Sequence, residues 1–158
     1  MNRMLSGHLS SIHRFLLRWL DRFPEDRLTK RVNGVANCAL WQAGHIAHSR
    51  HIIANWIGCE LERPDWVDLF TGGTSGDASL EWPKLPVIVR HLSETSEALI
   101  ERLNAMDPAY LLEPIEHVLS DGQAPRGENV LFLLYHEGFH AGQVEQVRRL
   151  IEYRGGVE

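Results

Sequence analysis

The sequence lacks the features that mark several common protein classes. It has only two cysteines, Cys38 and Cys59, which are too few and too far apart for a disulfide framework. No run approaches the roughly 20 apolar residues that cross a bilayer, and the N-terminus lacks the apolar core of a secretory signal. These absences predict a soluble, cytoplasmic protein without a membrane partner, in which both cysteines are ordinary buried thiols.

An excess of positive charge is also absent. The chain has 16 Lys and Arg against 21 Asp and Glu, which gives a formal net charge of -5 at pH 7. Proteins that bind nucleic acid use a basic surface to neutralise phosphates, so the charge argues against a nucleic-acid partner. The length of 158 residues predicts one domain, residues 1–158, that can bury a core of its own.

Convincing strand alternation is missing as well, whereas helical periodicity recurs four times. The expected helices cover about residues 4–22, 38–58, 84–106 and 126–153. Gly58 is placed to end the second helix in a left-handed conformation. A long connection over about residues 59–83, rich in Gly, Pro and aromatic residues, is expected to pack over one end of the helices. The sequence therefore predicts an all-α fold, an antiparallel four-helix bundle.

Two histidines interrupt the apolar seam of the expected fourth helix. The seam consists of Leu133, His136, His140, Val144, Val147 and Ile151. Because such a seam faces the core of a bundle, both imidazoles are expected to point inward. A buried imidazole needs partners for its ring nitrogens, and two on one helical face can share a metal ion. Hydrogen bonding within the core is the alternative.

The expected second helix offers a third imidazole. His45 lies on the same strip as Trp41, whereas His48 and His51 are turned about 60 and 120 degrees away, at ~100 degrees per residue. His45 is therefore expected to complete a three-histidine metal site with the pair in the fourth helix. His48 is an alternative third ligand, an acid–base group or a core residue. His51 is expected on a solvated face next to Arg50.

Three glycines stand beside these histidines, although each interior glycine costs a helix about 1 kcal/mol relative to alanine. They are Gly44, Gly138 and Gly142. Their positions indicate that space is needed near the imidazoles, as a bound ion would require. Close packing of helices without any ligand is the alternative explanation.

Two further residues are candidates for a catalytic role. Gln143 lies near the face of the histidine pair, where its amide could orient a ligand or substrate, or make a packing hydrogen bond. Glu137 is a candidate general base, but at ~100 degrees from its neighbour His136 it could instead be solvated. Thr95 and Ser96 are expected to line the cavity opposite the metal.

Two segments resemble the DinB/YfiT-like metalloenzyme superfamily. The run His-Glu-Gly-Phe-His-Ala-Gly-Gln, residues 136–143, is similar to its fourth-helix signature, and Trp41 followed four residues later by His45 is similar to its second-helix pattern. The resemblance implies that His45, His136 and His140 bind a divalent ion such as zinc, nickel or iron. It also implies a four-helix bundle that often forms homodimers.

The resemblance further implies the chemistry of the site. Members with known activities include transferases that use bacillithiol or mycothiol-type thiols, and a thiol-dependent maleylpyruvate isomerase. Three neutral imidazoles leave the charge of an ion intact, so a bound thiol or water loses its proton more readily. We therefore expect a metal-dependent thiol S-transferase or hydrolase that acts on a small molecule. The transferase would also use a low-molecular-weight thiol as a cofactor. The alternatives are a catalytically silent module that senses a small ligand, and a purely structural bundle.

Overall fold

Four long helices dominate the computed structural model, which describes residues 1–32, 37–74, 81–117 and 121–154. They are α1 (Asn2–Asp21), α2 (Ala39–Ile57), α3 (Leu85–Ala105) and α4 (Arg126–Arg154). Each begins and ends within about two residues of the position expected from the sequence, so the all-α interpretation is confirmed.

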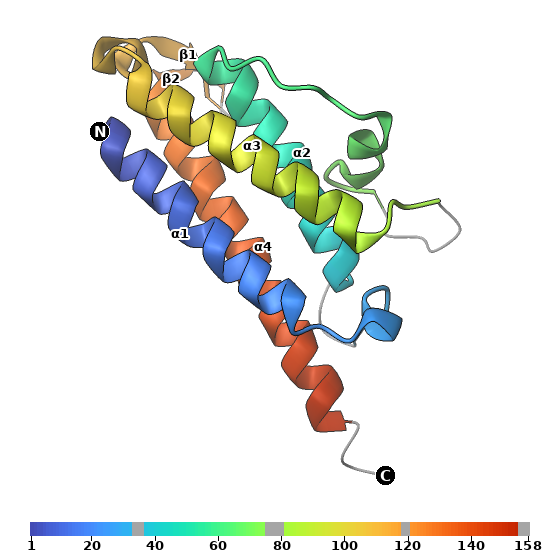
Figure 1. Cartoon of the computed structure of the whole chain (residues 1–158). Coiled ribbons are helices and arrows are strands. Elements are labelled where there is room, and N and C mark those ends of the chain that lie inside the picture. Colours follow the sequence, from blue (N-terminus) through green and yellow to red (C-terminus); the bar gives the residue numbers. More distant parts are fainter. Residues whose placement is uncertain (33–36, 75–80, 118–120, 155–158) are drawn as a thin grey trace.

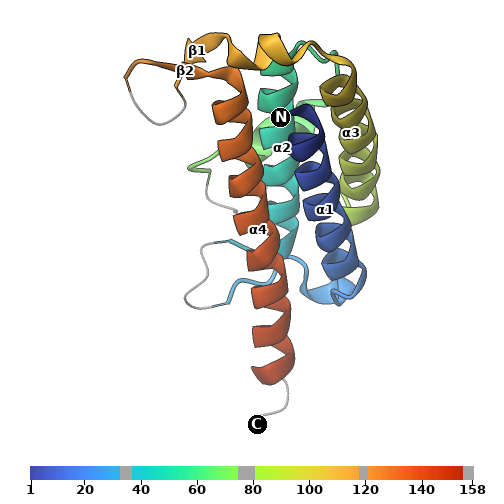
Figure 2. The same ribbon diagram turned by 90° about the vertical axis from the view of Figure 1, so that its left-hand side faces the viewer.

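The four helices lie side by side (Figures 1 and 2). α1 packs against α3 and α4, and α2 packs against the same two helices. The expected seam of α4 is confirmed, because Leu133, Val144, Val147 and Ile151 are all buried. Among the described residues, no helix combines the length and apolar composition needed to cross a bilayer.

α2 is buried on almost every side, because the connection to α3 covers the face that its neighbours leave open. This connection contains the short helix η2 (Asp65–Phe70), which packs directly on α2. The prediction that His51 and Arg50 are solvated is therefore wrong. Both are buried, and His51 Nε2 lies 2.9 Å from the Nε2 of His91 on α3.

Gly58 ends α2 as predicted, with a φ of 62° that residues bearing a Cβ rarely adopt. Its N–H and that of Cys59 bond to carbonyls in the last turn of α2, which turns the chain into the connection. Cys38 is buried as expected, whereas Cys59 is partly exposed, and both are free thiols.

A small hairpin precedes α4, which the sequence did not predict. β1 (Pro114–Glu116) pairs antiparallel with β2 (Gln123–Pro125), and Ile115 lies opposite Ala124. Strands of three residues are too short to show alternation. Two further short helices, η1 (Glu25–Arg27) and η3 (Pro108–Leu112), lie in the connections.

Candidate metal centre

Three imidazoles meet between α2 and α4. His45 on α2 places its Nε2 atom 3.0 Å from the Nε2 of His136 on α4, and the Nε2 of His140 lies 3.0 Å from the same atom. A ligand atom from each of the three rings lies within 4.8 Å of the other two. The predicted convergence of His45 with the pair on α4 is therefore confirmed.

In two of the rings, the hydrogen-bond partner of the outer nitrogen fixes which nitrogen carries the proton. His45 Nδ1 lies 2.7 Å from the main-chain carbonyl of Phe70, and His140 Nδ1 contacts the side-chain Oε1 of Gln42. Both oxygens only accept hydrogen bonds, so both Nδ1 atoms must carry the proton and donate it. The amide of Gln42 is oriented in turn by its Nε2, which donates to the Asn37 carbonyl over 3.5 Å.

It follows that the inner nitrogens cannot satisfy one another. Neutral His45 and His140 present lone pairs at Nε2, and His136 Nε2 faces both of them with at most one proton. The separations of 3.0 Å are close to the roughly 3.3 Å between two nitrogens on a tetrahedral ion with bonds of about 2.0 to 2.1 Å. The donor set therefore fits a divalent metal ion.

The imidazoles are also in the protonation state that a metal requires. Burial lowers the pKa of His45 and His136, and the neighbouring His45 lowers that of His136 further. Burial, with the charges of His136 and His45, lowers the pKa of His140 to about 3. All three rings are consequently neutral near pH 7, and their lone pairs are free to bind an ion.

The connection shapes the site from outside. A Cβ on Gly44 would overlap the ring of Phe70, so the glycine lets η2 approach α2 and bring the Phe70 carbonyl to His45. Trp41 stacks on the His45 ring with centroids 4.7 Å apart, and its Nε1 donates to Thr74 over 3.1 Å. The connection therefore holds His45 directly through the Phe70 carbonyl and indirectly through Trp41.

The prediction that Gly138 and Gly142 provide space for a bound ion is not supported by their surroundings. A Cβ on Gly138 would meet only ordinary contacts with Ile12 at 3.8 Å, and one on Gly142 would meet nothing within 4 Å. Of the three glycines, only Gly44 fills the predicted need for space, and it does so for an aromatic ring rather than for a ligand.

Comparison with known families agrees with this geometry. The sequence profile of the DinB superfamily matches residues 8–144, a range that contains all three histidines. The chain belongs to the DinB superfamily. No curated protein matches it. The resemblance that two helical segments indicated is therefore confirmed, and it extends over most of this DinB-superfamily protein.

The predicted accessory residues of the DinB-superfamily protein lie in different surroundings. Glu137 is fully buried, and its Oε2 accepts hydrogen bonds from Arg50, so the solvated alternative is wrong. Its carboxylate is not among the groups that converge with the histidines. Gln143 is half-buried beside His140, and a hydrogen bond with its side chain raises the pKa of that imidazole against the larger effect of burial.

His48 lies next to the three histidines without joining them. Its ring is 6.2 Å from that of His45 and nearly parallel to it, and burial lowers its pKa. His48 Nδ1 is buried without a hydrogen-bond partner among the described residues, so it is not a satisfied core histidine. The structure brings His45 rather than His48 into the group that could bind an ion.

Gln42 is a residue of the candidate site that was not predicted from the sequence. It is fully buried and holds His140 from across the α2–α4 interface. The available signal was its spacing, because a residue three positions before His45 lies on the same helical face. The Phe70 carbonyl carried no such signal, since a main-chain acceptor is common to every residue.

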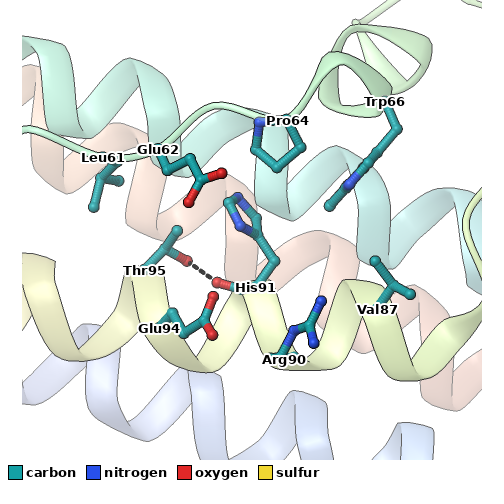
Figure 3. A pocket seen from close by; sticks show the side chains of 9 residues that line it. All are labelled: Leu61, Glu62, Pro64, Trp66, Val87, Arg90, His91, Glu94 and Thr95. Carbon is teal, nitrogen blue, oxygen red and sulfur yellow. Dashed lines mark hydrogen bonds between the residues drawn. The ribbon is translucent and has the colours of Figure 1, made fainter.

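A separate cavity of about 170 Å³ lies between the connection and α3. Figure 3 shows Glu62 and Trp66 of the connection facing His91 and Thr95 of α3 across it. None of the three converging histidines lines this cavity. The expected place of Thr95 opposite the metal is therefore wrong, and its hydroxyl donates to the carbonyl of His91 over 2.8 Å.

Proposed function

We propose that this protein is a metal-dependent enzyme of the thiol S-transferase or hydrolase type. His45, His136 and His140 would hold one divalent ion between the helices of an antiparallel four-helix bundle. The observation that carries the proposal is the convergence of three Nε2 atoms, which share at most one proton and so cannot all be satisfied by hydrogen bonds to one another. Imidazole ligands suit zinc, nickel and iron, so each is a candidate.

The surroundings of the three rings support chemistry on a small molecule. When bound, the ion supplies positive charge that lowers the pKa of a coordinated thiol or water. His136 is only half-buried, so a substrate reaches the centre from its side. Gln143 lies beside His140, where its amide would orient that thiol or water.

In the transferase reaction, a low-molecular-weight thiol provides the nucleophile. Its proton passes to solvent water, its sulfur forms a bond to an electrophilic carbon of the substrate, and the leaving group departs with the electrons of the carbon–leaving-group bond. The proposal includes the cytoplasmic location and the homodimer expected above, with no nucleic-acid or membrane partner.

Metal content tests the proposal directly. Purified wild-type protein is expected to contain about one divalent ion per chain, and the variants His45→Ala, His136→Ala and His140→Ala are expected to lose it. His8→Ala is the matched control, because His8 is exposed on α1. Wild-type protein that binds no stoichiometric ion when zinc, nickel or iron is supplied would rule out the proposal.

A thiol-transfer assay then tests catalysis. Metal-loaded protein is incubated with several low-molecular-weight thiols and a haloalkyl acceptor, and ester substrates test for hydrolysis. Turnover that disappears in His136→Ala supports an enzyme. Protein that retains its metal but turns over none of these compounds would favour a module that senses a small ligand.

A further inference from the structure

A charged pair lies fully buried among the long helices. The side chains of Arg50 on α2 and Glu137 on α4 are both 0% exposed. Arg50 donates from Nε and Nη2 to Glu137 Oε2 over 3.3 and 3.2 Å, and from Nη1 to the main-chain carbonyl of Leu92 on α3. One guanidinium therefore ties together three of the four long helices.

Stability alone does not account for this pair. Removing two charges from water costs free energy that their attraction returns only when the geometry is good, and apolar replacements of such pairs are often neutral or stabilising. Here both hydrogen bonds from Arg50 to Glu137 go to the same carboxylate oxygen, Oε2. The other oxygen, Oε1, has no hydrogen-bond partner among the described residues.

The pair lies next to the candidate metal centre on both helices that build it. Glu137 is the neighbour of His136 on α4, and Arg50 follows His45 by five residues on α2. At ~100 degrees per residue, each charged residue faces a different side of its helix from the nearby histidine. The ion pair and the three imidazoles thus join the same two helices at different faces.

A metal centre shared by two helices requires a fixed register between them. Ligands have to stay within about 0.5 Å of their productive positions, and here α2 contributes one imidazole while α4 contributes two. Apolar contacts can repack at little cost after a small slide, whereas buried polar groups can specify one register. A slide of α4 along α2 would break the ion pair and separate His45 from His136.

We infer that Arg50 and Glu137 are positioning residues, which set the register of α2 against α4 and so hold the three imidazoles at one metal-binding spacing. The inference rests on the proposed function, because it assigns the pair to the same metal centre. Glu137 acts through the helix that carries His136, rather than as a general base on substrate.

A double variant separates positioning from stability. Arg50→Met with Glu137→Leu replaces the pair by apolar side chains of similar size. Arg148→Met with Glu152→Leu is the matched control, because it removes the partly exposed ion pairs of Arg148 with Glu152 and Glu145 from the same helix α4, while Glu145 keeps its pair with Arg149. The measurements are denaturant unfolding without metal, zinc affinity by competition with a chelator, and the visible spectrum of bound Co²⁺, which reports ligand geometry.

The double variant is expected to fold with at least the metal-free stability of the wild type. It should bind zinc about 10- to 100-fold more weakly, with an altered Co²⁺ spectrum, while the control keeps the wild-type affinity and spectrum. A folded double variant with wild-type zinc affinity and Co²⁺ spectrum would overturn the inference and leave the proposed function intact.

Arg50→Lys keeps the test decisive if the double variant does not fold. Lysine retains the charge but loses the fork that reaches Glu137 and Leu92 together, so a smaller loss of zinc affinity is expected. Wild-type affinity in this variant would overturn the inference. Wild-type protein that binds neither zinc nor Co²⁺ would overturn the proposed function and the inference with it.

Discussion

At the scale of single residues, the candidate centre depends on acceptors that lie behind its imidazoles. Gln42 accepts the Nδ1 proton of His140, and the Phe70 carbonyl accepts that of His45. Such contacts fix the tautomer and orientation of a histidine ligand and increase its basicity. The two acceptors therefore belong to the site as much as the rings do.

Gln42→Met tests the side-chain acceptor. Methionine keeps the length of the side chain but cannot accept the His140 proton well, so zinc affinity is expected to fall about 10- to 100-fold. Competition with a chelator measures the change. Gln146→Met is the control, because Gln146 is exposed on α4. Equal affinity in wild type and Gln42→Met would show that the contact does not orient His140.

Acidification is expected to destabilise the metal-free protein. Burial, together with the charge of Arg50, lowers the pKa of His13 to about 4, and burial, together with His91, lowers that of His51 to about 4, against 6.5 in an exposed chain. Between these values the unfolded chain binds more protons than the folded one, so stability is complete above pH 6.5 and is lost as the pH falls toward 4.

Urea unfolding at pH 7.5 and pH 5.0 measures this loss. His13→Leu should reduce the difference between the two pH values, because one proton-binding group is gone from the unfolded chain. His8→Leu, at an exposed position of the same helix, is the control for the loss of an imidazole. Stability that is flat or higher at pH 5.0 would contradict the expectation.

Sequence reasoning at this scale succeeded where a residue repeated along a seam and failed where a contact came from elsewhere. His136 and His140 were predicted because they occupy apolar positions of α4. Arg50 and His51 were assigned to solvent because charge and position on the expected strip suggested it. Their burial depends on the connection and on α3, which no local pattern of α2 specifies.

At the scale of elements, the contact between η2 and α2 is the most consequential one outside the long helices. Phe70 is fully buried, and its ring occupies the space that the missing side chain of Gly44 leaves. The sequence predicted that the connection packs on the helices, but it did not predict where. The helix bounds were predictable from periodicity, whereas the β1–β2 hairpin was too short to leave a pattern.

Gly44→Ala is expected to displace η2. The added Cβ overlaps the Phe70 ring, and overpacking of this kind costs about 1 to 3 kcal/mol of unfolding free energy. Zinc affinity should fall as well, because the Phe70 carbonyl moves away from His45. Denaturant unfolding and chelator competition measure the two effects.

Gly7→Ala on α1 is the matched control. A Cβ there meets nothing within 4 Å, so the higher helix propensity of alanine should raise stability by up to about 1 kcal/mol. Equal stability changes in the two variants would show that the ring does not depend on the glycine.

At the scale of the whole molecule, metal binding and folding are expected to be linked. The three ligands come together only in the folded chain, so an ion that binds them stabilises the native state, by about 2.7 kcal/mol at a free concentration 100 times the Kd. Thermal unfolding with zinc, and again after chelation, measures the change in Tm. His136→Ala should show no shift, and a wild type without one would favour a purely structural role for the histidines.

The main-chain contact at Phe70 also affects what comparison of related sequences could reveal. A carbonyl oxygen is present whatever amino acid occupies the position, so no preference at residue 70 would record its bond to His45. We expect selection to act instead on Gly44, where a Cβ would overlap the Phe70 ring that packs there. An alignment would thus report this hydrogen bond through a residue that takes no part in it.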